Sequence, residues 1–238
     1  MSSLENALRI LACFDHKRQT VRVAELARNL SLPKSSVSRL LRVMAEFRML
    51  ERDQSELAYQ VGPRMAELAE LRSAKHPLAD LADAAVTGLV AEFGFTGYVS
   101  ILSGADIVLL RVRQGSYPLR HVREIGTRLP ATRTAMGKAL LSCCRDEELF
   151  ATIPHCLQPE TEIGATLLAD VAAARRDGFF KAQSQLTPGI TTIAAGVNDG
   201  RQSEPIVIAI AFPDIAVSPL LEIEMCRRVA AKAGDIAI

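Results

Sequence analysis

The sequence predicts a two-domain protein in which both domains belong to the α+β class. Its 238 residues exceed the usual single domain of about 100–150 residues and fall short of what three domains need. Hydrophobic residues make up 49% and charged residues 23%, which is enough apolar material for packed cores and excludes global disorder. Strand-like runs and helical patterns alternate irregularly, which favours α+β over a regular α/β fold.

The first helix is predicted from the N-terminus to about Phe14. Ser3 can cap it through its hydroxyl group, and apolar residues recur at helical spacing along one side. This apolar stripe consists of Leu4, Ala7, Leu8, Leu11 and Ala12. A polar loop follows, and residues 21–23 are long enough only for a minor edge strand.

Two further helices are predicted on either side of a short turn. The second covers about residues 24–29, and the third extends from Pro33 to about Phe47. Proline suits the first position of a helix, because its missing N–H leaves no hydrogen bond unmade there. The third helix turns its apolar residues inward, namely Val37, Leu40, Leu41 and Met44.

A hairpin and a connecting helix complete this part of the chain. Residues 49–52 and 57–61 are short strand-like runs joined by a polar stretch, which is the pattern of a wing. Gly62-Pro63 ends the hairpin, and apolar residues at helical spacing follow. The predicted division is a winged helix-turn-helix over residues 1–62, a linker helix over 63–75 and a second domain over 76–238.

The second domain mixes helices with strands. Helical patterns cover residues 78–93, 134–143, 166–176 and 219–233. Strand-like runs cover residues 98–102, 107–112, 190–197 and 206–212. The longest clean apolar run has seven residues, whereas a membrane-spanning helix needs roughly 20. We therefore expect no membrane association, and without a secretory leader we expect a cytoplasmic protein.

Charge is distributed unevenly between the two parts. Residues 1–62 contain ten Lys and Arg against seven Asp and Glu, a net charge of +3, and the remainder carries −2. A basic small domain joined to a mildly acidic larger one fits a DNA-binding head on a sensor body, although a solvated surface can reach +3 by chance.

The third helix carries the chemistry that a DNA-recognition helix needs. In a helix-turn-helix, the N-terminal residues of the second helix reach base edges and phosphates in the major groove. Short hydroxyl side chains and cations occupy the face that the inward residues leave free. The predicted DNA-binding residues are Lys34, Ser35, Ser36, Ser38, Arg39 and Arg42, with Arg22 and the wing as phosphate clamps. The alternative is an amphipathic helix with a solvated basic face.

Several stretches resemble the IclR family of bacterial regulators. In the first domain these are residues 7–11, 24–27, 32–41 and 59–63, which include Leu32-Pro33-Lys34-Ser35-Ser36-Val37-Ser38-Arg39. In the second domain they are residues 125–130, 134–141, 188–190 and 193–195. The resemblance spans essentially the whole chain in order. It implies a C-terminal effector-binding domain of GAF-like fold, and homodimers or tetramers that bind palindromic double-stranded DNA operators.

Two turn residues depart from the family pattern. Ser31 stands where the family usually has glycine before Leu-Pro, and Arg48 replaces the usual glycine after the third helix. Glycine tolerates positive φ more readily than these residues do, so we expect a slight shift of both turns.

The resemblance also implies where an effector would bind. The aligned positions are Ala135, Met136, Ala182, Thr192, Ile210 and Phe212, and Arg133 lies next to the matched helix. They are mostly apolar, which favours a flat, apolar, aromatic acid, because burying an unpaired polar group costs about 1–3 kcal/mol. Arg133 is the candidate for holding a carboxylate by two hydrogen bonds, with an exposed surface role as the alternative.

Catalytic, metal and cofactor sites are not expected. Gly137-Lys138 lacks the preceding residues of a phosphate-binding loop, and no nucleophile–base motif is recognisable. Five cysteines form no C-x-x-C pair, and adjacent Cys143 and Cys144 cannot readily direct both thiols to one metal shared with His155 and Cys156. We expect packing cysteines, no bound metal or cofactor, and no enzyme.

The sequence thus favours a DNA-binding transcription regulator, either activator or repressor, of a catabolic operon. Its second domain would bind a small organic-acid or aromatic effector that favours one arrangement of the paired DNA-binding heads. In the alternative hypothesis, the second domain only oligomerises or senses a protein partner.

Overall fold

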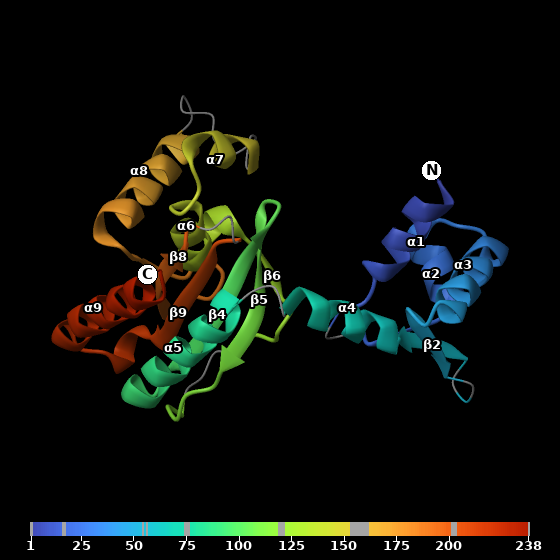
Figure 1. Ribbon diagram of the computed structural model, residues 1–238, viewed down its shortest axis with the longest axis horizontal. Helices are drawn as coiled ribbons and strands as arrows, with labels where there is room; N and C mark the ends of the chain where they lie inside the picture. Colours follow the sequence, from blue (N-terminus) through green and yellow to red (C-terminus); the bar gives the residue numbers. More distant parts are fainter. Residues whose placement is uncertain are drawn as a thin grey trace. The chain divides into compact units, whose positions relative to one another are not determined.

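The computed structural model describes residues 2–15, 18–53, 55, 57–73, 77–118, 122–152, 162–200 and 204–237. The chain divides into two compact units, Met1–Lys75 and His76–Ile238, and each has its own core (Figure 1). Both units combine helices with an antiparallel sheet, which confirms the two-domain α+β class. None of the helices among the described residues combines the length and the hydropathy that a membrane span requires.

The first unit is a helix-turn-helix with a three-stranded sheet. Its helices are α1 (Ser3–Leu11), α2 (Val23–Leu30), α3 (Lys34–Glu46) and α4 (Pro63–Ser73), and its strands are β1 (Thr20–Val21), β2 (Leu50–Asp53) and β3 (Ala58–Val61). The strands lie in the order β1-β3-β2, all antiparallel, so β2 and β3 form the predicted hairpin and β1 is its edge. The fully buried Ile10, Leu26, Val37 and Leu41 join α1, α2 and α3 in one core.

The first helix differs from the prediction in its cap and in its buried face. The side chain of Ser2, not Ser3, accepts the N–H of Glu5, and the helix ends at Leu11 rather than near Phe14. Ile10 is completely buried, whereas Leu4 and Leu8 are 70% and 56% exposed. The predicted stripe was therefore wrong in its centre, because helical spacing alone does not say which of two adjacent apolar stripes faces the core.

The two turns that lack the family's glycine keep the left-handed backbone that glycine would adopt. Ser31, after α2, has φ 54°, and Arg48, after α3, has φ 59°. The N–H of Leu32 then bonds the carbonyl of Ala27, which closes the turn into α3. The expected shift of these turns is not seen, and the two side chains instead occupy a strained conformation.

The second unit is built on a six-stranded antiparallel sheet in the order β6-β5-β4-β9-β8-β7. The strands are β4 (Thr96–Ser103), β5 (Asp106–Arg113), β6 (Arg128–Pro130), β7 (Phe180–Gln183), β8 (Ile190–Val197) and β9 (Ile206–Pro213). The helices are α5 (Pro77–Phe93), α6 (Ala135–Leu141), α7 (Asp146–Thr152), α8 (Glu162–Asp177) and α9 (Pro219–Ile236), with single 3-10 turns η1 (Ala131–Arg133) and η2 (Asp214–Ala216). The short elements β6, β7 and α7 were not predicted.

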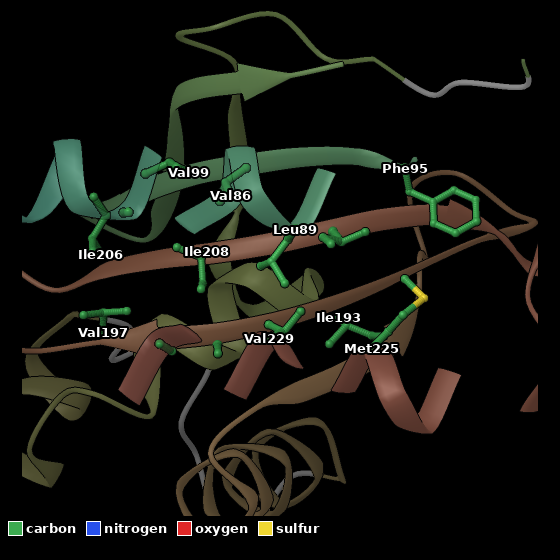
Figure 2. Close-up of a cluster of buried hydrophobic side chains, with 14 of the residues drawn as sticks. Val86, Leu89, Phe95, Val99, Ile193, Val197, Ile206, Ile208, Met225 and Val229 are labelled. Carbon is green, nitrogen blue, oxygen red and sulfur yellow. The ribbon is translucent and has the colours of Figure 1, made fainter. Parts of the chain in front are cut away.

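Each face of this sheet has its own hydrophobic core. Helices α5 and α9 cover one face, and α6 lies against the other (Figure 1). Figure 2 shows the first core, in which side chains of β4, β9 and β8 meet those of α5 and α9. Its labelled members include Val99, Ile208, Ile193, Val86, Leu89, Met225 and Val229. Because side chains alternate along a strand, the neighbouring residues Tyr98, Ala209 and Ala194 enter the second core, on the α6 side.

Candidate functional sites

The first candidate site is the exposed face of α3. Val37, Leu41 and Met44 are buried, and Leu40 is half-buried against the same core. The helical period then places the hydroxyl and basic side chains on the opposite side. The structure leaves all of the predicted set exposed, namely Lys34, Ser35, Ser36, Ser38, Arg39 and Arg42, together with Arg22 before α2.

The N-terminal end of this face is suited to binding an anion. Pro33 precedes α3 without any side-chain cap, and the first turn holds no acidic residue, so its free N–H groups favour an anion. Among the described residues, Lys34 and Arg39 form no ion pair, whereas Arg42 lies 3.8 Å from Glu46. Lys34 and Arg39 can therefore meet DNA without first breaking a bond.

The described part of the wing carries both acidic and basic side chains. Its described strands carry Arg52 beside the carboxylates Glu51 and Asp53. Arg52 lies 5.9 Å from the centre of the Tyr59 ring, and Glu51 accepts a bond of 3.3 Å from Gln60. The described part of the wing therefore offers one cation beside two carboxylates, whereas α3 carries three cations.

The second candidate site is a cleft on the α6 side of the large sheet. The space between its lining residues, open solvent included, measures about 490 Å³. Three of its lining residues form a row across the sheet, because Ala182 pairs with Thr192 and Thr192 pairs with Ala211. The lining consists of Tyr98, Arg123, Leu129, Arg133, Thr134, Ala135, Met136, Ala182, Gln183, Ser184, Leu186, Ile190, Thr192 and Ala211.

The cleft carries two cations and, among its lining residues, no carboxylate. Arg123 donates a hydrogen bond of 3.0 Å to Thr187 Oγ1, a neutral partner. Arg133, exposed at the end of η1, has no hydrogen bond or ion pair within the described chain. An anion would therefore meet positive charge without competition from an internal acid.

Tyr98 is the largest polar side chain of the cleft, and it is 2% exposed. Burial raises the pKa of its phenol, while a hydrogen bond from the backbone of Arg123 and the charge of that arginine oppose the rise. The phenol is therefore protonated at neutral pH. Gln183 is engaged with the Asp214 carboxylate, and Ser184 Oγ accepts the N–H groups of Leu186 and Thr187.

Close packing fixes the start of α6 at the wall of the cleft. Thr134 caps the helix by accepting the N–H of Gly137 at 3.0 Å. A Cβ atom on Gly137 would collide with the backbone of Ala131, and one on Gly196 of β8 would collide with the Ala139 carbonyl oxygen. Glycine at these two positions lets η1 and β8 approach α6, which explains Gly137 without any nucleotide-binding role.

Helix α6 is also tied to α8 by polar contacts. Lys138, 12% exposed, forms an ion pair of 2.6 Å with Asp170 and lies 5.2 Å from the centre of the Phe180 ring. Arg175 of α8 donates to the carbonyl oxygens of Ser142 and Cys144, just after α6, at 3.1 and 2.6 Å. These contacts tie the middle of the short helix and the residues just after it to α8.

The structure brings most of the predicted effector residues together. Arg133, Ala135, Met136, Ala182 and Thr192 all line the cleft. Ile210 and Phe212, which the alignment also placed in the effector site, do not line this cleft. Both side chains lie in the core under α5 and α9, because they alternate with Ala211, the β9 residue that faces the cleft.

Sequence analysis also missed the more polar part of the lining. The predicted set contained no residue from three of the segments that line the cleft, namely β4 and two loops. These segments contribute Tyr98, Arg123 and Ser184. The alternation of β4 could have indicated Tyr98, because its neighbours Val99 and Ile101 belong to the opposite core. Arg123 lies in an irregular segment, for which no periodic signal exists.

The cysteines are consistent with packing positions. Burial raises the pKa of the Cys143 thiol to about 11, and the adjacent Cys144 contributes to the rise. Cys143 and Cys144 direct their thiols to the carbonyls of Ala139 and Leu140. His155 and Cys156 lie outside the described residues, and within these no group of three or more metal-ligating side chains occurs.

Comparisons with known proteins agree on one family. The IclR helix-turn-helix domain model matches residues 3–54, and the model of the bacterial transcriptional regulator IclR C-terminal domain matches residues 72–237. Among curated proteins, the transcriptional repressor AllR of Escherichia coli is 26% identical over 216 residues, covering 89% of this chain and 80% of AllR. The regulator XynR of Escherichia coli is 24% identical over 203 residues, covering 83% and 80%.

Solved structures share the fold. An IclR transcriptional regulator from Silicibacter superposes with a TM-score of 0.83 at 22% identity, covering 99% of this chain and 95% of its own. An IclR homologue from Microbacterium hydrocarbonoxydans, complexed with 4-hydroxybenzoate, superposes with a TM-score of 0.79 at 20% identity, covering 99% of each chain.

The chain therefore belongs to the IclR family, and it is a DNA-binding transcriptional regulator with an N-terminal helix-turn-helix. Its curated relatives are regulators and not enzymes.

Proposed function

We propose that this regulator controls a catabolic operon and responds to a small organic acid, aromatic in its main body, bound in the cleft beside α6. The observation that carries the proposal is Arg133, a cation without an internal partner among the described residues, on a cleft with no acidic lining residue. Leu129, Ala135 and Met136 supply an apolar wall against which a ring can pack. The homologue complexed with 4-hydroxybenzoate supports the same ligand class.

The DNA-binding half of the proposal rests on the exposed set of α3. Lys34 and Arg39 reach phosphates or base edges, Ser35, Ser36 and Ser38 add hydrogen bonds, and Arg22 and Arg42 clamp the backbone. Two copies in a homodimer or tetramer would present two such helices to a palindromic operator. The wing, with its two described carboxylates, contributes less than the sequence alone suggested.

Calorimetry tests the effector half. Benzoate and 4-hydroxybenzoate should bind the wild type, and Arg133→Gln should weaken both by at least tenfold, because a charge-assisted hydrogen bond contributes about 1.5–3 kcal/mol. Arg145→Gln, an exposed arginine paired with Glu148 and absent from the cleft lining, is the matched control. If no acid binds, the second unit senses a protein partner or only oligomerises.

Gel-shift titration tests the DNA half, with operators selected from a pool of random duplexes. Arg39→Ala should weaken binding by about 1–3 kcal/mol and flatten the dependence of log K on log salt by about 0.9. Arg64→Ala, an exposed arginine of α4 paired with Glu67, serves as the control. An unchanged operator affinity in Arg39→Ala would remove α3 as the recognition helix.

A further inference from the structure

One buried hydroxyl group in the second unit has no hydrogen-bond partner among the residues that the structure describes. Thr96, the first residue of β4, is 3% exposed, and its Oγ1 atom bonds nothing in the described chain. A buried polar group without a partner is rare in native proteins, because it loses its water without replacing the hydrogen bond. Thr96 therefore calls for an explanation.

The sheet register places Thr96 directly beside the cleft lining, although Thr96 itself is buried and is not one of the lining residues. Thr96 pairs with Ala211, which pairs with Thr192, which pairs with Ala182. The last three of these side chains line the cleft, and directly paired residues have their Cβ atoms about 4.5–5.5 Å apart. Thr96 is thus the next position of the row that forms the floor.

The alternation of β4 settles the direction in which Thr96 points. A Cβ atom on Gly97 would meet Val86 of α5, and Val99 packs in the same α5 core. Tyr98 and Ser100 face the α6 side instead, and Thr96 has their parity. Tyr98 bonds the backbone of Arg123, and Ser100 Oγ lies 3.5 Å from Met136 Sδ, so Thr96 alone of these three lacks a partner.

We propose that the Thr96 hydroxyl is the inner hydrogen-bonding point of the cleft. It selects acids that carry a hydroxyl group on the end remote from the carboxylate. The exposed Arg133 takes the carboxylate, and the apolar wall holds the ring between the two polar ends. This inference rests on the proposed function and adds the feature by which one acid is preferred over another.

Calorimetry with two acids of similar size tests the inference. The wild type should bind 4-hydroxybenzoate about tenfold more tightly than 4-methylbenzoate, because the methyl group leaves the Thr96 hydroxyl unpaired. Thr96→Val, which replaces the hydroxyl by a methyl group, should abolish or reverse this preference. Thr96→Ser, which keeps the hydroxyl, should retain it.

The outcomes separate this inference from the proposed function. If Thr96→Val binds both acids with the wild-type preference, the inference is overturned and the cleft remains an acid site. If the wild type binds neither acid, the proposed effector class fails and this inference fails with it. Thr96→Val should also fold and melt at or above the wild-type temperature. A clear loss of stability would show that the hydroxyl serves the protein itself, and would equally overturn the inference.

Discussion

The surface of α3 and the cleft beside α6 are assembled in opposite ways. Most of the α3 set lies within nine consecutive residues, from Lys34 to Arg42, and one helix presents it. The cleft collects side chains from β4, two loops, η1, α6 and four further strands. A site carried by one helix depends only on the helical period, whereas the cleft depends on packing between segments more than 100 residues apart. The cleft is therefore the more vulnerable to substitutions that leave its own chemistry unchanged.

The largest effect is expected from Gly137→Ala. The added methyl group would overlap the backbone of Ala131, which cannot move without displacing η1 and the cleft rim. We expect a loss of more than about 4 kcal/mol in the free energy of unfolding, measured by urea denaturation. Gly88→Ala, in α5 with open space around the new atom, should instead stabilise by about 0.5–1 kcal/mol. Equal effects would mean that α6 and η1 are not closely packed.

A pair of substitutions on β9 tests which face of the strand forms the cleft. Ile210→Ala should cost about 2–5 kcal/mol of stability through a cavity under α5 and α9, and leave the affinity for benzoate unchanged. Ala211→Leu should fill the cleft and weaken benzoate binding by about tenfold or more. Calorimetry and thermal unfolding of both variants would reveal a reversed pattern if the register of β9 were shifted by one residue.

The pH dependence of stability should carry a signature of Cys143. Its pKa in the folded protein, about 11, lies above the ordinary value of 9.0, so folding favours the neutral thiol. This contribution is complete below pH 9 and is lost as the pH rises through 11, on the order of 2 kcal/mol in all. Urea denaturation at pH 8 and pH 10.5 should therefore show a steeper loss for the wild type than for Cys143→Ala. Parallel losses would contradict the buried thiol.

The smallest effects are expected at the two left-handed turns of the first unit. Ser31→Gly and Arg48→Gly should each stabilise by about 0.5–1 kcal/mol, because relief of backbone strain exceeds the added entropy of the unfolded chain. Ala69→Gly, at an exposed helical position of α4, should have the opposite sign. Thermal unfolding resolves these changes, and a destabilised Ser31→Gly would show that the serine side chain supports the turn.

The same contrast explains what sequence reasoning could predict. The helix-turn-helix, the hairpin and the long elements of the second unit follow from periodicity, and Lys34 to Arg42 follow from one helix. Ile210 and Phe212 were expected in the effector site, whereas the structure places them in the core under α5 and α9, since neighbouring residues of a strand face opposite sides. Leu4 and Leu8 belong to the apolar stripe predicted for the first helix, yet both are exposed in the first unit. Arg123 and Thr96 are brought to the cleft or beside it by the packing of distant segments, and no local sequence pattern predicts that packing.

The polar ties between α6 and α8 have a mechanical consequence. Lys138 is one turn from the cleft-lining Ala135, and its ion pair with Asp170 is short and partly buried. Arg175 donates hydrogen bonds to two carbonyl oxygens just after the C-terminus of this helix. A molecule that displaces the first turn of α6 must carry α8 along or break these bonds. A displacement that begins at a few cleft residues would thereby reach a helix of sixteen residues.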